Sequence, residues 1–205
     1  MTGLFITLEG GDGTGKSTQG ALLGDWLTAR GREVVFTREP GGTDLGVQLR
    51  EIVLHSRGHI APRAEALLYA ADRAHHIATL VRPALERGAV VIQDRYIDSS
   101  VAYQGAGRVL DPAEVRQVSE WATEGLVPTL TVLLDLDPVA GRERLQSDNK
   151  PFDRLETEAL EFHERVRTAY LGMAEAEPAR FLVIDAALDR AVIHERIIER
   201  VSQLA

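Results

Sequence analysis

The sequence lacks cysteine altogether, which excludes disulfide bonds, zinc–thiolate centres and cysteine nucleophiles. It also lacks an apolar run near the ~20 residues that a helix needs to span a bilayer. The chain does not open with a charged segment followed by a long apolar stretch, so we expect no signal peptide. Acidic residues outnumber basic residues by 31 to 23, and the formal net charge of −8 argues against a general nucleic-acid or membrane-surface binder. We therefore expect a cytoplasmic protein without a nucleic-acid or membrane partner.

The rest of the composition suits one globular domain over residues 1–205, because 44% of the residues are hydrophobic and can form a full core. Short apolar runs alternate with longer segments of helical periodicity. Strands are expected at 4–8, 34–37, 89–92, 130–134 and 181–184. Helices are expected at 16–30, 45–54, 112–124, 138–145, 156–176 and 188–202, with one long helix after Pro62. Strands that are apolar throughout and separated by helices indicate an α/β fold, a five-stranded parallel sheet with helices on both faces.

A glycine-rich stretch, TLEGGDGTGKSTQ at 7–19, lies between the first expected strand and helix. Residues 10–17 fit G-x-x-x-x-G-K-[ST] in the strand-to-helix context that this pattern requires. The glycines let several backbone N–H groups point into one concavity, where the helix N-terminus adds its positive dipole end. Lys16 is expected to reach the β- and γ-phosphates of a nucleotide, Ser17 to hold Mg²⁺, and Thr18 to touch the α-phosphate. The predicted phosphate-binding residues are Gly10, Gly11, Asp12, Gly13, Thr14, Gly15, Lys16, Ser17 and Thr18.

An acidic residue at the end of another apolar strand is the second element expected of such a site. Asp94 follows the run 89–92 and is expected to hold a water of the Mg²⁺ shell. The stretch NKPFD does not match the guanine-reading Asn-Lys-x-Asp of GTPases, because Phe152 stands where the acid belongs. A helicase or motor ATPase would usually be larger and carry a basic surface. The chain length therefore favours a small kinase with a P-loop kinase fold.

Several arginines follow strand ends, where a doubly wound fold places its ligand crevice. REPGGT at 38–43 follows the second expected strand, and Arg95 directly follows Asp94. Arg50 and Arg73 lie on the next two expected helices. An acidic protein that gathers arginines at this edge is equipped for phosphate-rich ligands.

Five stretches, in order over nearly the whole chain, resemble the bacterial thymidylate kinases: EGGDGTGKST, REPGGT, LLYAADR, DRYIDSSVAYQG and DRLE. DRYIDSSVAYQG discriminates best, because a generic P-loop kinase has no reason to carry it. The resemblance implies transfer of the γ-phosphoryl group of ATP to dTMP, giving dTDP and ADP in dTTP biosynthesis, with Mg²⁺ as cofactor. It also implies a homodimer formed through helices near His75 and His76. Adjacent histidines diverge on a helix, so a solvated surface is the alternative for both.

The same resemblance implies how the acceptor is bound. Asp12 would contact the sugar 3′-hydroxyl, and Arg95 with Arg50 would grip the acceptor phosphate. Arg73 would hydrogen-bond the base, on which Tyr69 stacks. Because arginine only donates, it satisfies O4 of thymine but not the amino group of cytosine.

A second group of implied acceptor contacts lies on the helix expected after Arg95. Ser99, Ser100, Tyr103 and Gln104 belong to it, and Ser100 and Gln104 would face the base from positions one turn apart. Tyr103 resembles the residue that blocks a 2′-hydroxyl, while plain packing is its alternative. Glu39 is expected to help hold the metal or the acceptor region, or else to pair with Arg38.

The donor side departs from part of the family. Some thymidylate kinases carry an arginine where this chain has Gly13, so the compensating positive charge is expected from a lid segment at 147–154. Arg154 matches the lid arginine best, and Lys150 is a weaker candidate. Arg142 and Arg144 lie two positions apart on the preceding helix and so point in different directions, one toward phosphate and the other toward adenine.

The acceptor is already an anionic phosphate oxygen, so the expected mechanism needs no general base. Lys16, Mg²⁺, Arg95 and Arg154 would surround the migrating phosphoryl group. Two alternatives stay open on the sequence alone. One is a kinase for another nucleotide or nucleoside, such as dCMP or UMP. The other is a P-loop regulator that hydrolyses ATP slowly and acts through a partner.

Overall fold

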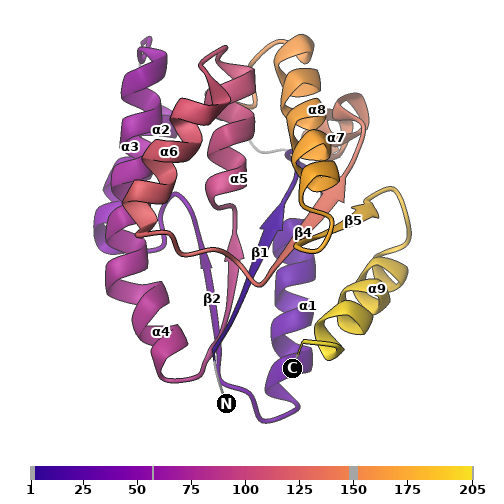
Figure 1. Cartoon of the computed structure of the whole chain (residues 1–205). Helices are drawn as coiled ribbons and strands as arrows, with labels where there is room; N and C mark the ends of the chain where they lie inside the picture. The colour runs from indigo at the N-terminus through magenta and orange to yellow at the C-terminus, as the bar shows by residue number, and fades with distance from the viewer. Residues whose placement is uncertain (1–2, 57, 148–151, 205) are drawn as a thin grey trace.

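The sheet is built from five parallel strands, and the computed structural model that shows it describes residues 3–56, 58–147 and 152–204 (Figure 1). The strand order is β2-β3-β1-β4-β5, which places the first strand at the centre. This arrangement confirms the predicted α/β sheet. The strands are β1 (Leu4–Glu9), β2 (Val34–Arg38), β3 (Val90–Asp94), β4 (Leu130–Asp135) and β5 (Phe181–Asp185).

The helices largely follow the predicted segments, with π-helical stretches η1 and η2 in two places. The long helix after Pro62 widens at η1, where Pro83 lacks the N–H that an α-helix would donate one turn back. The helices in chain order are α1 (Lys16–Thr28), α2 (Asp44–His55), α3 (Pro62–His76), η1 (Ile77–Val81), α4 (Arg82–Glu86), α5 (Ile97–Ser100), η2 (Val101–Gly107), α6 (Pro112–Thr123), α7 (Pro138–Ser147), α8 (Leu160–Ala176) and α9 (Arg190–Ser202).

One predicted helix starts later than its periodicity indicates. The segment expected to be helical from Glu156 begins its α-helix at Leu160. The Asp153 carboxylate accepts from the backbone N–H groups of Leu155 and Glu156, at 2.8 and 2.9 Å. The Glu156 carboxylate accepts in return from the Asp153 N–H at 2.8 Å. These reciprocal bonds hold 153–156 as a separate turn.

Two apolar cores lie on opposite faces of the sheet. Alternating residues of a strand point to opposite faces, so Leu4, Ile6 and Leu8 share one core while Phe5 belongs to the other. Helices α1 and α9 cover the first face, with α9 beside α1 at the lower right of Figure 1. Helices α3, α5, α8 and the stretch η2 cover the second face.

The parallel arrangement brings every strand's carboxyl end to one edge. The glycine-rich loop follows β1 there, Glu39 follows β2, and Arg95 follows β3. Predicted ligand residues that are far apart in sequence therefore share one edge. Within the described ranges, no helix is both long and apolar enough to cross a membrane.

Candidate functional site

The loop from Gly10 to Ser17 curls around the amino group of Lys16. Three of its glycines adopt positive φ angles, 131° at Gly10, 74° at Gly13 and 89° at Gly15, which other residues rarely tolerate. Lys16 Nζ donates to the carbonyl oxygens of Gly10 and Gly11 at 3.2 and 2.6 Å. Burial and the neighbouring Arg95 guanidinium lower the pKa of Lys16, but nearby carboxylates favour its charged form. The loop thus holds an ammonium group against its own carbonyl oxygens at the start of α1.

The hydroxyl of Ser17 and the carboxylate of Asp94 meet beside this loop. Ser17 Oγ donates to Asp94 Oδ2 at 3.1 Å, although 77 positions separate the two residues. The other carboxylate oxygen, Asp94 Oδ1, is buried, and no donor among the described residues reaches it. A hydroxyl beside a carboxylate with one uncompensated buried oxygen fits the hard oxygen-ligand preference of Mg²⁺. In the described part of the chain there is no group of three His, Cys, Asp or Glu residues that would form an all-protein metal cage.

Arg95 bridges the glycine-rich loop and the helix that follows β3. Its φ of 68° lies in the left-handed region, so the backbone turns sharply between β3 and α5. Nη1 donates to the Gly10 carbonyl at 3.1 Å and to Ser99 Oγ at 3.2 Å. Nη2 forms an ion pair with Asp12. A strained backbone that is held by contacts on two elements is typical of a functional position.

The Arg95 guanidinium sets the electrostatics of its neighbours. It lies 4.9 Å from the centre of the Tyr103 ring, and the Tyr103 hydroxyl donates to Asp12 Oδ2 at 3.1 Å. Burial would raise the pKa of Asp12, but Arg95 and Lys16 outweigh it and lower that pKa. The Tyr103 hydroxyl and the Asp12 carboxylate raise the pKa of Arg95 in spite of burial. Asp12 and Arg95 therefore form a charged pair at the centre of the site.

Arg73 is almost completely buried, with 1% of its surface exposed. Nε donates to Glu39 at 2.7 Å, Nη1 to Ser119 at 3.1 Å, and Nη2 to Ser100 and the Tyr96 carbonyl at 3.0 Å each. These bonds use four of the five N–H groups of a guanidinium and leave one on Nη1. Arg73 also lines the cleft that joins the glycine-rich loop to the predicted acceptor residues.

Glu39 and His76 correct two expectations drawn from the sequence. Both Glu39 oxygens are engaged, one by Arg73 and the other by His76 Nδ1 at 2.9 Å, so Glu39 orients Arg73 and does not pair with Arg38. His76 was expected on a solvated surface or at a subunit contact, and this is wrong. It is fully buried, with its second nitrogen 2.7 Å from Thr37 Oγ1.

A cleft of about 590 Å³ joins the glycine-rich loop to the predicted acceptor residues. Arg50 lies on its wall and donates to the Pro40 carbonyl at 3.0 Å, while burial and the nearby Arg38 lower the pKa of Arg50. Gln104, from η2, donates to Glu65 at 3.0 Å. The cleft brings together residues 12–18 with Glu39, Arg50, Tyr69, Arg73, Asp94, Arg95, Ser99, Ser100, Tyr103 and Gln104.

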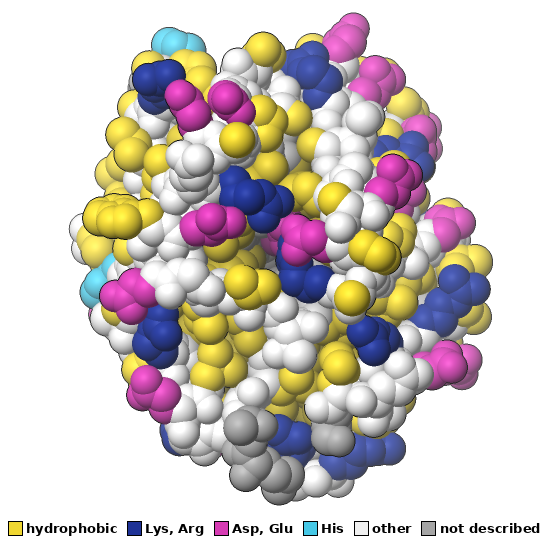
Figure 2. All heavy atoms as spheres, viewed as in Figure 1, with side chains coloured by type: hydrophobic (Ala, Val, Ile, Leu, Met, Phe, Trp, Pro, Cys, Tyr) yellow, Lys and Arg dark blue, Asp and Glu magenta, His cyan; other side chains and the backbone are white. Residues whose placement is uncertain are grey.

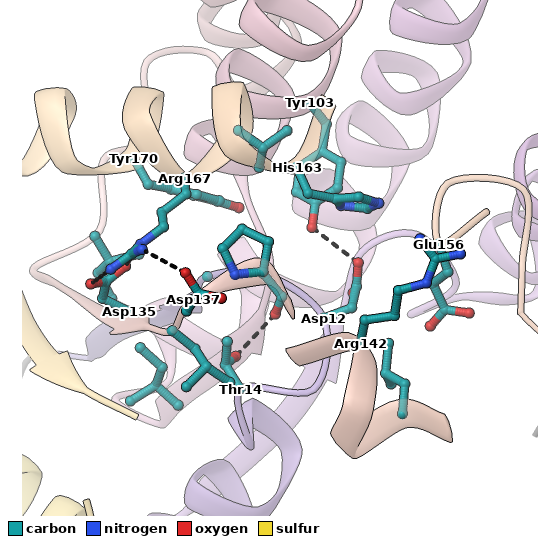
Figure 3. A pocket seen from close by; sticks show the side chains of 18 of the residues that line it. Asp12, Thr14, Tyr103, Asp135, Asp137, Arg142, Glu156, His163, Arg167 and Tyr170 are labelled. Atoms are coloured by element: carbon teal, nitrogen blue, oxygen red, sulfur yellow. Dashed lines mark hydrogen bonds and ion pairs between the residues drawn. The ribbon is translucent and has the colours of Figure 1, made fainter. Parts of the chain in front are cut away.

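The three predicted donor-side arginines lie apart from one another. Arg142 lies 5.6 Å from the Phe152 ring centre and lines a smaller pocket of about 50 Å³ between α7, α8 and the loop (Figure 3). Arg144 points elsewhere and donates to the Ala186 carbonyl at 3.0 Å. Arg154 forms an ion pair with Glu65 and donates to the Val53 carbonyl at 2.8 Å, so the structure does not bring it to the loop. Lys150 and the rest of 148–151, within the predicted lid, lie outside the described residues.

Several contacts of the site were missed by sequence reasoning. Glu9 is fully buried and accepts from Ser99 at 2.6 Å and from Tyr170 at 2.8 Å, both of which also lie within reach of Arg95. An acidic residue at the end of an apolar strand was the available signal for Glu9. Gly141 of α7 packs directly on the loop, since a Cβ there would lie 2.7 Å from the Asp12 carbonyl oxygen. The sequence carries no signal for Gly141 or Tyr170, because their partners are distant in the chain.

Glu156 is a further acidic group beside the loop. It lies near Asp12 and Arg142 in Figure 3 and lines both the cleft and the smaller pocket. Burial and the neighbouring carboxylates of Asp153 and Asp12 raise the pKa of Glu156. It belongs to the matched DRLE stretch, but the sequence did not single it out.

Comparisons with known proteins agree with this geometry. The model of the thymidylate kinase family matches residues 8–197. A thymidylate kinase of Clavibacter sepedonicus is 72% identical over 96% of this chain and 93% of its own length. That of Leifsonia xyli subsp. xyli is 73% identical over 90% and 88% of the two chains. The crystal structure of thymidylate kinase from Ehrlichia chaffeensis superposes with a TM-score of 0.80 at 31% identity, covering 98% of this chain and 99% of that chain. The predicted P-loop kinase fold and resemblance are thereby confirmed, and the chain belongs to the thymidylate kinases, a family of nucleoside monophosphate kinases.

Proposed function

We propose that the chain transfers the γ-phosphoryl group of ATP to dTMP, giving dTDP and ADP for dTTP synthesis. Family membership supports dTMP phosphorylation. The observation that carries the proposal is the single cleft that joins a phosphate-binding loop to a second set of cationic side chains. Two anionic nucleotide ends can meet in such a cleft, each with its own anchors.

The acceptor occupies the side of the cleft formed by α2, α3 and α5. Arg50 and Arg95 bind its phosphate, and the Tyr69 ring provides a stacking surface for the base. The remaining Nη1–H of Arg73 donates to O4 of thymine, since the other four N–H groups are engaged. Tyr103 packs against the sugar, where its ring disfavours a 2′-hydroxyl.

Catalysis rests on positioning and charge stabilisation, because the attacking phosphate oxygen is already anionic. Lys16 exchanges its contacts with the Gly10 and Gly11 carbonyls for the β- and γ-phosphate oxygens. Arg95 exchanges Asp12 for the acceptor phosphate and the migrating group, which leaves Asp12 free for the 3′-hydroxyl. Fixed donors of this kind act where charge develops, at no reorganisation cost during the reaction.

Ser17 and Asp94 would hold Mg²⁺, as the uncompensated Asp94 oxygen supports. When bound, Mg²⁺ neutralises charge on the β- and γ-phosphate oxygens. Ser17 sits at the first turn of α1, and Asp94 at the end of β3. Two elements of the rigid sheet edge therefore fix the oxygen ligands.

The donor side is completed by α7 and by the lid expected at 147–154, within a single domain. Arg154 would leave Glu65 to reach the transferred phosphoryl group. Arg142 and Arg144, which point in different directions, would contact phosphate and adenine. Closure over ATP would exclude water and limit hydrolysis.

We further propose a homodimer through α3 and α6, in a protein of the cytoplasm. Leu67 on α3 is 59% exposed and lines a groove between these helices together with Val118. Figure 2 shows hydrophobic side chains along the left edge, where α3 and α6 lie in Figure 1. Light scattering after gel filtration should give twice the chain mass, and Leu67→Glu should give the mass of one chain.

A coupled ADP-release assay with several acceptors tests the proposed reaction. The rate with ATP should rise strongly on adding dTMP and little on adding dCMP, with dUMP and the ribonucleotide of thymine as further acceptors. ADP release that dTMP leaves unchanged would instead support the P-loop regulator. Preference for dCMP or UMP would assign the chain to another acceptor.

A further inference from the structure

The amide of Gln104 is anchored at one end only. Its Nε2 donates to Glu65 Oε1 at 3.0 Å, and Gln104 lines the cleft with 2% of its surface exposed. No donor among the described residues reaches its Oε1. Glu65, on α3, is fully buried and does not line the cleft. Gln104 therefore stands between a buried carboxylate and the proposed base site.

Glu65 acts as an acceptor only, because its surroundings keep it ionised. Arg108 Nε donates to Oε1 at 3.2 Å, Arg108 Nη2 to Oε2 at 3.3 Å, and Arg154 forms an ion pair with Oε2. Burial alone would raise the pKa of Glu65, but the hydrogen bonds from Gln104, Arg108 and Arg154 outweigh it and lower that pKa. An ionised carboxylate has no proton to donate.

This acceptor fixes which end of the Gln104 amide remains for a ligand. A glutamine amide has two donors on nitrogen and one acceptor oxygen, and rotation by half a turn exchanges the two ends. The reversed amide would place Oε1 against the Glu65 oxygens, so two acceptors would meet without a proton. Glu65 thereby holds the Nε2 end of the Gln104 amide against its own carboxylate. The Oε1 end is then the one that faces the cleft.

We propose that Glu65 is a positioning residue that makes Gln104 an acceptor-only reader of the base edge. The inference rests on the proposed acceptor function. Thymine and uracil present an N3–H donor beside the O4 acceptor, which matches Gln104 Oε1 beside the Arg73 donor. Cytosine presents an acceptor at N3 and an amino group at position 4, so it mismatches both. Glu65 then contributes to base choice without touching the base.

Glu65→Gln is the sharpest test, since it preserves shape and should reverse the Gln104 amide. While Arg154 is still paired with Glu65, two arginine donors (Arg154 and Arg108 Nη2) face the Oε2 position and one (Arg108 Nε) faces Oε1, so the single oxygen of the new glutamine stays at the Oε2 position. The NH₂ group of the new glutamine then faces Gln104. The Gln104 amide therefore turns its oxygen toward residue 65 and its NH₂ group toward the base. The ratio of kcat/KM for dCMP over dTMP should rise on the order of tenfold.

Two comparisons separate positioning from a general effect on folding. Glu158→Gln removes the other carboxylate on Arg108, which it contacts at 2.5 Å, and should leave the ratio unchanged. In a Gln104→Leu background, Glu65→Gln should no longer change the ratio, because no amide remains to be turned. Glu65→Asp, which keeps the charge but withdraws the carboxylate from Gln104, should also raise the ratio and serves if Glu65→Gln does not fold.

The inference is overturned if soluble Glu65→Gln or Glu65→Asp keeps the wild-type ratio. It is equally overturned if Glu65→Gln shifts the ratio as much in the Gln104→Leu background. These outcomes are separate from the proposed reaction, which fails only if the wild-type chain does not prefer dTMP.

Discussion

The acceptor side and the donor side of the cleft hold their arginines differently. Arg73 is 1% exposed and makes four hydrogen bonds within the second core. Arg142 and Arg144, by contrast, are exposed on α7, and Arg144 is held by one bond to the Ala186 carbonyl. Arg73 is therefore fixed by the same contacts that stabilise the fold.

This difference suits the buried arginine to base recognition and the exposed arginines to contact with a moving phosphate. An arginine held on four sides has no rotamer freedom left to lose on binding, so it can select a base edge. An arginine on an exposed helix can follow a phosphate through the reaction. Substitution of Arg73 should thus affect stability and selectivity together, whereas substitution of Arg142 or Arg144 should affect catalysis or ATP binding alone.

The largest expected effect is on stability at Arg73. Arg73→Ala leaves Glu39 as a buried carboxylate without its cationic partner, which should lower the free energy of unfolding by about 3–5 kcal/mol. Urea unfolding followed by circular dichroism measures this. Arg87→Ala, which removes an exposed ion pair with Glu33, should cost less than about 1 kcal/mol. Equal losses in the two variants would contradict the contrast.

Arg95 is expected to control turnover. Arg95→Ala should reduce kcat by on the order of a hundredfold or more, as does loss of a donor that stabilises developing charge. The kcat of Arg95→Lys should lie between those of wild type and Arg95→Ala, because lysine keeps the charge but cannot contact Gly10 and Asp12 at the same time. The coupled assay at saturating substrates measures kcat. A near-normal kcat for Arg95→Ala would remove this residue from the mechanism.

Glu9 should make stability fall as the pH rises. Burial and the nearby Asp98 carboxylate raise the pKa of Glu9 from 4.5 to about 7, against the hydrogen bonds from Ser99 and Tyr170. The folded chain then keeps a proton that the unfolded chain releases near pH 4.5. Between these two pH values the free energy of unfolding should fall by about 3 kcal/mol, the contribution being complete below pH 4.5 and lost above about 7.

Glu9→Gln tests that pH dependence directly, because it removes the titrating group and keeps the shape. The difference in unfolding free energy between wild type and variant should change by about 3 kcal/mol between pH 4.5 and 8. Parallel stability curves for the two proteins would show that Glu9 does not titrate in this window.

Gly141 gives the smallest expected effect and the most local one. A Cβ at this position would lie 2.7 Å from the Asp12 carbonyl oxygen, so Gly141→Ala should push α7 away from the loop. Overpacking of this kind costs about 1–3 kcal/mol, and KM for ATP should rise on the order of tenfold. KM for dTMP should change by less than about twofold. Gly172→Ala on α8, where a Cβ meets nothing within 4 Å, is the matched control.

Much of the fold could be predicted from the sequence, because the strands are apolar runs and the residues of the glycine-rich loop are consecutive in the chain. The run Leu4–Glu9 with the loop after it predicts a central parallel strand and a phosphate site from adjacent residues alone. Asp94 and Arg95 also follow a strand directly, so topology brings them to the loop. The positions of these residues can be predicted because, in a parallel sheet, residues that directly follow the strands lie together at one edge.

The rest of the site depends on side-chain contacts between distant segments. His76 looks like a surface residue by its neighbours, yet Thr37 and Glu39 enclose it from β2 and the loop after it. Arg154 matches a lid arginine, but its pairing with Glu65 spans 89 positions and has no local pattern. Sequence reasoning identifies residue types for the chemistry, and only the folded chain shows which partner each one holds.

The contact between Gly13 and Gly141 also limits how this enzyme can be rebuilt from its relatives. A Cβ at Gly13 would lie 2.5 Å from the Gly141 carbonyl oxygen, and φ there is 74°. An arginine introduced at position 13, as in the thymidylate kinases that carry one there, would therefore clash with the backbone of α7. The loop and the helix form one exchangeable module, and a chimera must inherit both from the same parent.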